Sequence, residues 1–160
     1  MTYDIASREV PDQPIVSIRE RHPLSELPAF IGRSFGEIYQ HLALLGAVPS
    51  GEPFIIYHSF GPDDLDVEAC APIAREVVAT GRISARVLSA TTVAETLHVG
   101  PYEALGEAYG ALTGWIAQNG YEVAGPVRET YLNEPGPGVP PEAYRTRIAM
   151  PIAMAAVAAR

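Results

Sequence analysis

The sequence predicts an α+β fold in which two β-α-β-β units build one antiparallel sheet with two helices on one side. Three observations predict it: an internal repeat, two amphipathic helical stretches that end at glycine, and strand-like segments flanking each helix. Each half alone would leave a large apolar sheet face uncovered. We therefore expect a single domain over residues 1–160, with pseudo-repeats at about 14–73 and 85–152.

The repeat relates residues 31–57 to residues 105–131 without a gap, at a constant offset of 74 residues. Apolar character is also kept at several positions, among them Phe35 with Tyr109. After a longer insertion, CAPI (70–73) matches AMPI (149–152). This self-similarity indicates an internal duplication. The identical pairs are Gly32 and Gly106, Gly36 and Gly110, Ala43 and Ala117, Gly46 and Gly120, Gly51 and Gly125, and Tyr57 and Tyr131.

Each half supplies one helix and several strands. The first helix is expected from about Pro28 to Leu45, and the second begins after Pro101, because proline suits a first helical turn. Gly46 and Gly120 are expected to end these helices in a left-handed conformation. Segment 134–143 is too rich in Pro and Gly for regular structure. Strands are predicted at 15–21, 54–60, 66–73, 85–90, 92–99, 126–133 and 144–152.

Composition and charge exclude several classes of function. The net charge of −8 argues against a nucleic-acid partner. All eleven basic residues are Arg, so a Walker lysine and Schiff-base chemistry are absent. The single Cys70 excludes an intramolecular disulfide and is expected to be a small core residue, and the four histidines lack ligand spacing, so we expect no metal or cofactor. The charged N-terminal stretch lacks the apolar core of a signal peptide, and the longest apolar run, IAMPIAMAAVAA, is too short to span a bilayer. We expect a cytoplasmic protein with no membrane partner.

A carboxylate interrupts the strand that contains RETYLN (128–133). On alternation, Glu129 and Tyr131 share one face with Val127. The repeat places Ile55 at the position of Glu129 and Tyr57 at that of Tyr131. If an approximate two-fold axis relates the halves, these strands meet near it and form a cleft lined by the two tyrosines, the isoleucine and one negative charge.

Two interpretations of Glu129 remain open at this point. The carboxylate could be solvated or paired with an arginine such as Arg128, Arg145 or Arg147, since Glu is seldom buried without a partner. Alternatively, a ligand cation could relieve the cost of burying it, with roughly 0.5–2 kcal/mol of cation–π attraction from each neighbouring ring. Such a site favours flat, cationic, apolar molecules.

Other candidates are weighed in the same way. We expect the His98 imidazole to bond the backbone in a turn, whereas Tyr102 could equally line the cleft or belong to that turn. Trp115 lies at helical spacing with Leu112 and is expected in the core, with a role in the cleft floor as the alternative. The CAPI/AMPI alignment pairs Asp66 with Arg145 and Glu68 with Arg147, which predicts structural ion pairs across the domain.

Nearly the whole chain, from about Tyr3 to Ile152, resembles the GyrI-like small-molecule-binding domain, also called the AraC effector-binding or multidrug-regulator effector domain. The matching stretches are DVEACAPI, LHVGPYEALGEAYGALTGWIAQNG, GPVRETYLN and YRTRIAMPI. The resemblance implies a duplicated, barrel-like β-α-β-β fold with a central cleft. The resemblance also implies that, as in transcription regulators of this type, amphipathic and often cationic compounds bind in that cleft against a glutamate, which the match to PVRETYLN places at Glu129. We expect a stand-alone member of this family rather than a regulator with its own DNA-binding part.

The resemblance fixes the fold better than the activity. Our first hypothesis is a binding module whose ligand contacts Glu129, Tyr131, Tyr57, Ile55, Tyr102 and Trp115. The second is a hydrolase that opens strained cyclopropane rings, with Glu129 as general base and Tyr131 or Tyr102 bonding the oxyanion. A third is a protein-binding inhibitor of DNA gyrase. Binding is favoured because one carboxylate in a cleft is sufficient for it.

Overall fold

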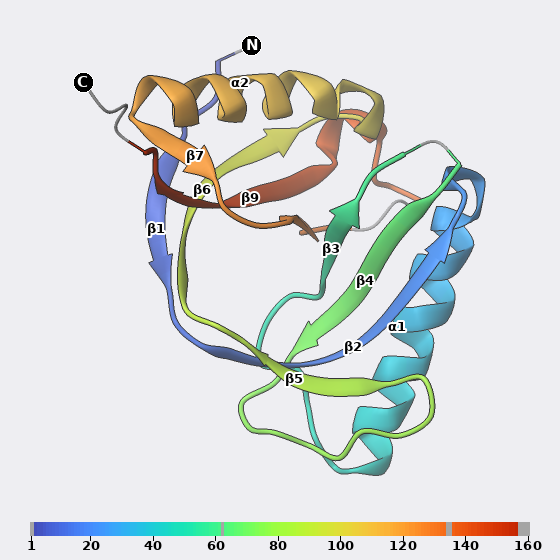
Figure 1. Cartoon of the computed structure of the whole chain (residues 1–160). Helices are drawn as coiled ribbons and strands as arrows, with labels where there is room; N and C mark the ends of the chain where they lie inside the picture. Colours follow the sequence, from blue (N-terminus) through green and yellow to red (C-terminus); the bar gives the residue numbers. More distant parts are fainter. Residues whose placement is uncertain (1, 62, 134–135, 157–160) are drawn as a thin grey trace. The chain divides into compact units, whose positions relative to one another are not determined.

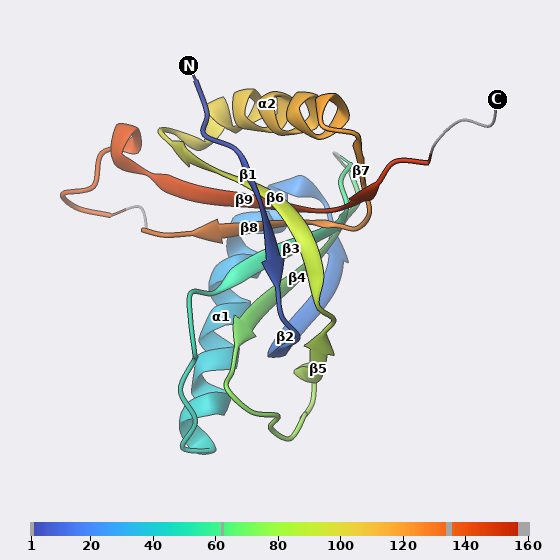
Figure 2. The same ribbon diagram turned by 90° about the vertical axis from the view of Figure 1, so that its left-hand side faces the viewer.

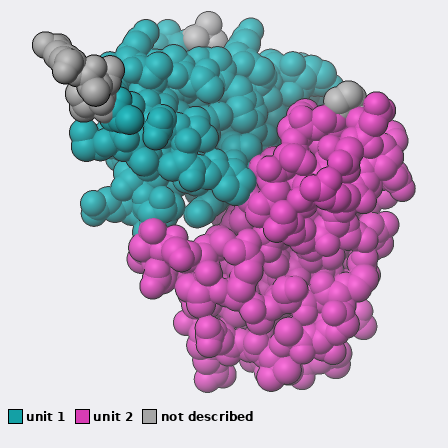
Figure 3. Space-filling view, viewed as in Figure 1, with its two compact units in different colours: residues 1–10, 91–160 teal, residues 11–90 magenta. Residues whose placement is uncertain are grey.

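The computed structural model describes residues 2–61, 63–133 and 136–156. The chain forms two compact units: unit 1 contains residues 1–10 and 91–160, and unit 2 contains residues 11–90 (Figure 3). Residues 1 and 157–160, at the two ends of the predicted domain, lie outside the described residues. So do residues 134–135, the first two of the predicted 134–143 loop. Each unit combines one long helix with an antiparallel sheet, which confirms the predicted α+β fold.

In unit 2, a four-stranded antiparallel sheet packs on helix α1 (Leu27–Leu44), which follows a short 3₁₀ turn, Leu24–Glu26 (Figure 1). The strands lie in the order β3-β4-β2-β5. Every residue of β4 is buried. The bounds are Gln13–His22 for β2, Phe54–Ser59 for β3, Leu65–Pro72 for β4 and Ser84–Leu88 for β5.

Alternation gives the two faces of this sheet different characters. The even-numbered residues of β2 face α1, because the His22 ring lies 4.8 Å from that of Phe30 and Glu20 pairs with Arg33 of the helix. Ile18 lies opposite Ala69, which lies opposite Ile55, so Ile55 and, two residues on, Tyr57 also face α1. The other face carries Arg19 and Arg21 of β2 and Asp66 and Glu68 of β4.

In unit 1, helix α2 (Leu105–Gln118) lies across the sheet in the same way (Figures 1 and 2). The strands lie in the order β1-β6-β9-β8, and β7 pairs with the C-terminal end of β9. The 3₁₀ turns Tyr102–Ala104 and Pro141–Ala143 precede α2 and β9. The bounds are Ala6–Val10 for β1, Thr91–Val99 for β6, Tyr121–Val123 for β7, Val127–Tyr131 for β8 and Arg145–Met154 for β9. Buried core residues under α2 are Ala94, Ala108, Leu112, Ile116, Ile148, Met150 and Ile152.

The strand registers agree with the sequence repeat. In unit 2, Ile55 lies opposite Ala69 and Tyr57 opposite Val67. In unit 1, Glu129 lies opposite Ile148 and Tyr131 opposite Thr146. The buried helix positions Ser34, Ile38 and Leu42 likewise recur 74 residues later as Ala108, Leu112 and Ile116. Ile55 and Glu129 thus occupy equivalent positions in their units; the origin of the units by duplication stays a prediction.

Three strands differ from the sequence-based expectation. The β1 and β7 strands were not predicted, because β1 (ASREV) is polar and mostly exposed and β7 has only three residues. The sequence pattern assigns 85–90 to the second repeat, but β5 pairs with β2 in unit 2. The equivalent edge position in unit 1, beside β6, is filled by β1.

Both predicted glycine stops adopt the left-handed backbone conformation, with φ of 67° at Gly46 and 77° at Gly120. A Cβ atom at either position would meet nothing within 4 Å. The substitutions Gly46→Ala and Gly120→Ala are therefore expected to cost about 1–2 kcal/mol of stability through backbone strain alone. Urea unfolding measures this loss; an unchanged midpoint for both variants would contradict it.

In the part of the chain that the structure describes, neither helix is long and apolar enough to cross a membrane.

Candidate functional site

Glu129 is buried in unit 1, where its side chain points toward helix α2. The residue is 6 % exposed. The Tyr109 hydroxyl, from α2, donates a hydrogen bond to Glu129 Oε2, and the Tyr131 hydroxyl donates one to Oε1 at 2.8 Å. Each carboxylate oxygen thus accepts one phenolic O–H, and the predicted shared face of Glu129 and Tyr131 is confirmed.

In the part of the chain that the structure describes, no cationic side chain is paired with this carboxylate. Among the described residues, no arginine forms an ion pair with Glu129, so neither the solvated nor the arginine-paired interpretation matches the structure. Burial raises the pKa of Glu129 above the ordinary value for glutamic acid, and the hydrogen bonds from Tyr109 and Tyr131 offset only part of that rise.

Aromatic rings extend from this carboxylate along the end of β8. Tyr102, in the 3₁₀ turn before α2, meets Tyr131 edge-on with ring centroids 5.9 Å apart. The Tyr102 ring also stacks on that of Tyr144, with the ring centroids 4.9 Å apart. Tyr102 therefore belongs both to the turn and to the group of rings around Glu129.

A row of buried polar side chains crosses the sheet next to Tyr131. Thr146 lies opposite both Tyr131 and His98. The His98 Nε2–H donates to the Pro101 carbonyl at 3.1 Å, and the Tyr3 hydroxyl donates to Nδ1 at 2.9 Å, which confirms the expected backbone-bonding role of His98. Thr146 is fully buried, and its Oγ1 has no hydrogen-bond partner among the described residues.

The remaining predicted site residues have other surroundings. Trp115 is half-buried, stacks on Tyr121 at 6.1 Å and packs against the core under α2, as expected for a core residue. Ile55 is fully buried in unit 2, and Tyr57 is 7 % exposed with its ring edge-on to Phe60. Their participation in a ligand site with Glu129 stays a prediction.

Sequence reasoning missed Tyr109 as a partner of Glu129. The repeat places Phe35 at the equivalent position of α1. The half that has a carboxylate at this strand position thus also has a hydroxyl at this helix position, and the other half has Ile55 and Phe35 there. This coupled difference between the two halves could have identified Tyr109 as the partner of Glu129 from the sequence alone.

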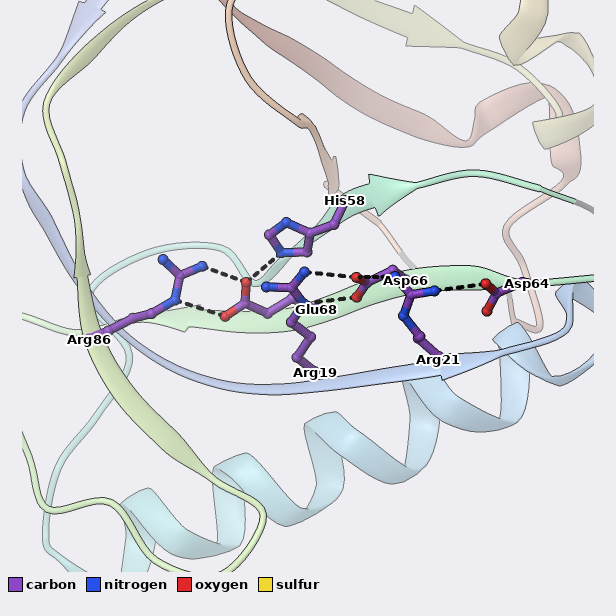
Figure 4. A network of polar contacts seen from close by, with 7 residues as sticks. All are labelled: Arg19, Arg21, His58, Asp64, Asp66, Glu68 and Arg86. Atoms are coloured by element: carbon purple, nitrogen blue, oxygen red, sulfur yellow. Dashed lines mark hydrogen bonds and ion pairs between the residues drawn. The ribbon is translucent and has the colours of Figure 1, made fainter.

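A second buried carboxylate, Glu68, lies on the face of the unit 2 sheet away from α1 (Figure 4). The Arg86 guanidinium binds both carboxylate oxygens, with Nε 3.1 Å from Oε2 and Nη2 2.5 Å from Oε1. The Ser17 hydroxyl and the His58 Nε2–H also donate hydrogen bonds to the Glu68 carboxylate, at 2.6 and 2.8 Å. Burial acts to raise the pKa of Glu68, but the hydrogen bonds from Arg86, Ser17 and His58 outweigh it and hold the pKa below the usual value. Cys70 is buried beside this cluster, as expected for a small core residue.

Asp66 extends this network along β4. The guanidinium of Arg19 binds both of its oxygens, at 2.8 and 2.7 Å, and this keeps the pKa of Asp66 below its usual range. Arg21 bridges Asp66 and Asp64. The ion-pair partners that the structure gives to Asp66 and Glu68 thus come from their own unit. The β2–β4 register, which the repeat alignment does not contain, sets these partners. The predicted pairing with Arg145 and Arg147, which lie in unit 1, stays a prediction.

Within the described residues, no group of three or more His, Cys, Asp or Glu side chains is arranged to hold a metal ion. The chemistry of the Glu129 site is that of a buried acid held by neutral hydroxyl donors and flanked by aromatic rings.

Comparisons with known proteins bear on the family and the fold. The model of the GyrI-like small molecule binding domain matches residues 3–153. No curated protein matches the chain. The crystal structure of the EcmrR C-terminal domain is similar, with 26 % identity and a TM-score of 0.84 over 96 % of this chain and 99 % of that one.

Two further solved structures share the fold. In the cryo-EM structure of the EcmrR–DNA complex, the similarity (26 % identity, TM-score 0.82) covers 95 % of this chain but 58 % of that chain. SAV2435 bound to tetraphenylphosphonium has 14 % identity and a TM-score of 0.60 over 96 % of this chain and 94 % of that one. Because the family model spans nearly its full length, the chain belongs to the GyrI-like small-molecule-binding domain family.

Proposed function

We propose that this protein binds amphipathic cations, aromatic ones above all, with the Glu129 carboxylate as the charged contact and Tyr131 and Tyr102 as aromatic neighbours. The observation that carries the proposal is a buried carboxylate whose hydrogen-bond partners are two neutral hydroxyls. A buried ionised carboxylate is costly unless it is paired. A ligand cation would supply the missing charge, and the rings beside it would add cation–π attraction.

Similar proteins support this choice of ligand class. SAV2435 has the same fold and was solved with tetraphenylphosphonium, a cation covered by four aromatic rings. EcmrR, of which this chain matches the C-terminal domain, forms a complex with DNA. For the present chain we infer ligand binding; direct contact with nucleic acid is not expected because the net charge is −8.

The hydrogen-bond directions favour binding over hydrolysis. A hydrolase would need a tyrosine hydroxyl aimed at a developing oxyanion. In this structure the hydroxyls of Tyr109 and Tyr131 both donate to Glu129. Cyclopropane hydrolysis, with Glu129, Tyr131 and Tyr102 in the catalytic roles, therefore remains the second hypothesis.

Titration with tetraphenylphosphonium at neutral pH tests the proposal. The substitution Glu129→Gln keeps the shape of the side chain and removes its charge. We expect affinity to fall about 10–100-fold, because a contact to a charged group contributes about 1.5–3 kcal/mol. Calorimetry or ligand fluorescence measures the change.

Glu95→Gln is the matched control, since Glu95 lies in the same unit and forms a partly exposed ion pair with Arg8. It should bind like the parent protein. Equal affinity in the parent and in Glu129→Gln, with circular dichroism showing both to be folded, would exclude Glu129 as the charged contact.

A further inference from the structure

We propose that a cation binding at Glu129 displaces a proton: the carboxyl group is protonated in the ligand-free protein and ionised in the complex, so cation binding is coupled to pH. This inference rests on the proposed function and adds a regulation of the same site. The proton leaves the carboxyl oxygen for solvent as the ligand cation arrives, so the net charge of the site is unchanged.

The geometry around the carboxyl group accommodates both of its forms. When Glu129 is ionised, Tyr109 and Tyr131 each donate an O–H to one of its oxygens. A phenolic oxygen can also accept a hydrogen bond. When Glu129 is protonated, its own O–H can therefore donate to one of these tyrosines while the other continues to donate to the free carboxyl oxygen. The proton can be gained or lost without leaving a buried polar group unpaired.

Among the described residues of unit 1, no positively charged group compensates the ionised form of Glu129 in the absence of a ligand. The groups that face Glu129 are Tyr109 from α2, Tyr131 from its own strand β8 and the apolar Ile148 opposite it on β9. On β6, His98 lies opposite Thr146, as Tyr131 does, and its two ring nitrogens are occupied by Tyr3 and the Pro101 carbonyl. The carboxyl group is thus the member of this cluster whose charge a cation would change, and the raised pKa of Glu129, caused mainly by burial, agrees with this.

Unit 2 contains the same framework without the acid. Ile55 occupies the equivalent strand position and Phe35 the equivalent helix position. Because the carboxylate and the helix hydroxyl occur together in one unit and are both absent from the other, the tyrosine on α2 acts as a positioning residue for Glu129.

Calorimetry on the full chain tests the coupling. Tetraphenylphosphonium is titrated between about pH 4.5 and 9, in pairs of buffers that differ in ionisation enthalpy, to count the protons released. We expect release close to one proton per cation at the acidic end and none at the alkaline end. As the pH rises through the range in which protons are released, the Kd for the cation should fall by up to tenfold per pH unit.

Single substitutions separate the roles of the three side chains. Glu129→Gln should release no proton at any pH. Tyr109→Phe and Tyr131→Phe each remove a hydrogen bond that stabilises the anion, so the release curve should move to higher pH in both. Two controls outside the site, Glu95→Gln and Tyr39→Phe, should leave the curve in place; Glu95 and Tyr39 are a partly exposed carboxylate and an exposed tyrosine.

The outcomes distinguish this inference from the proposed function. Cation binding without proton exchange over the whole pH range would overturn the coupling and leave the binding function intact. Absence of cation binding at every pH would overturn both. Infrared spectroscopy of the ligand-free protein gives an independent measure: a protonated-carboxyl band that Glu129→Gln removes supports the coupling, and its absence at the acidic end rules it out.

Discussion

Replacing Glu68 by glutamine is expected to lower the free energy of unfolding by about 2–4 kcal/mol at neutral pH. The substitution keeps the shape of the side chain but turns an acceptor-only carboxylate into an amide. The amide N–H₂ would then face the donors of Arg86 and His58, which hold the carboxylate in the parent protein. The loss stays below that of a fully buried pair because the Arg86 side chain is 42 % exposed and can be partly hydrated.

Denaturant unfolding of Glu68→Gln beside Glu95→Gln measures this loss. The control breaks a more exposed ion pair and should cost at most about 1 kcal/mol. Equal losses in the two variants would show that the Glu68 network adds nothing beyond an ordinary surface pair.

The difference between the parent and Glu68→Gln should also depend on pH. Because the pKa of Glu68 is lowered by folding, its stabilisation is fully present above the ordinary pKa of a glutamic acid. It is lost as the pH falls through the depressed pKa of the folded state. The free energies of unfolding of the parent and of Glu68→Gln should therefore become equal at acidic pH. A difference that stays constant down to the acid transition would assign the loss to packing rather than to charge.

Glu129 should give the opposite dependence in the ligand-free protein. Its pKa is raised by folding, so its contribution to stability is full below the ordinary pKa and declines as the pH rises through the folded value. The two buried glutamates should thus differ in the sign of the pH dependence of their contributions to the free energy of unfolding. A guanidinium partner holds Glu68 as a structural ion, whereas the partners recorded for Glu129 are phenolic, which is consistent with the ligand role that we propose for it.

The sequence predicted the elements that have strong periodicity. Both long helices and the seven strands with clear alternation are present, because apolar spacing and glycine stops determine them locally. The β1 strand could not be predicted in this way. Its five residues carry no apolar face, and it forms because β6 has a free edge far along the chain.

The same distinction applies to the site. Comparison of the two halves singled out Glu129 and Tyr131, since that comparison needs only the repeat. The ion pairs of Asp66 and Glu68 depend instead on which strand lies beside β4, and β2 and β5 supply the arginines. Partners that come from neighbouring strands become visible only with the sheet register.

A glutamate placed at the equivalent position of unit 2 tests which features of unit 1 allow Glu129 to be buried there. Ile55→Glu would bury a carboxylate at a fully buried position that faces α1, and we expect it to cost about 3–5 kcal/mol of stability at neutral pH. The cost should shrink in mild acid, because a carboxyl group with a burial-raised pKa is penalised only as the pH rises above its unfolded value. Urea unfolding at two pH values measures both effects.

The second substitution, Phe35→Tyr, then supplies the helix hydroxyl that Tyr109 provides in unit 1. Added to Ile55→Glu it should restore about 1–3 kcal/mol, whereas alone it should change stability little, since Phe35 is only half-buried. A positive coupling energy in this double-mutant cycle would mean that a donor on the helix is what allows a carboxylate on the strand. Strict additivity would mean that Glu129 is tolerated for a reason specific to unit 1, and Tyr109 would then lose its positioning role.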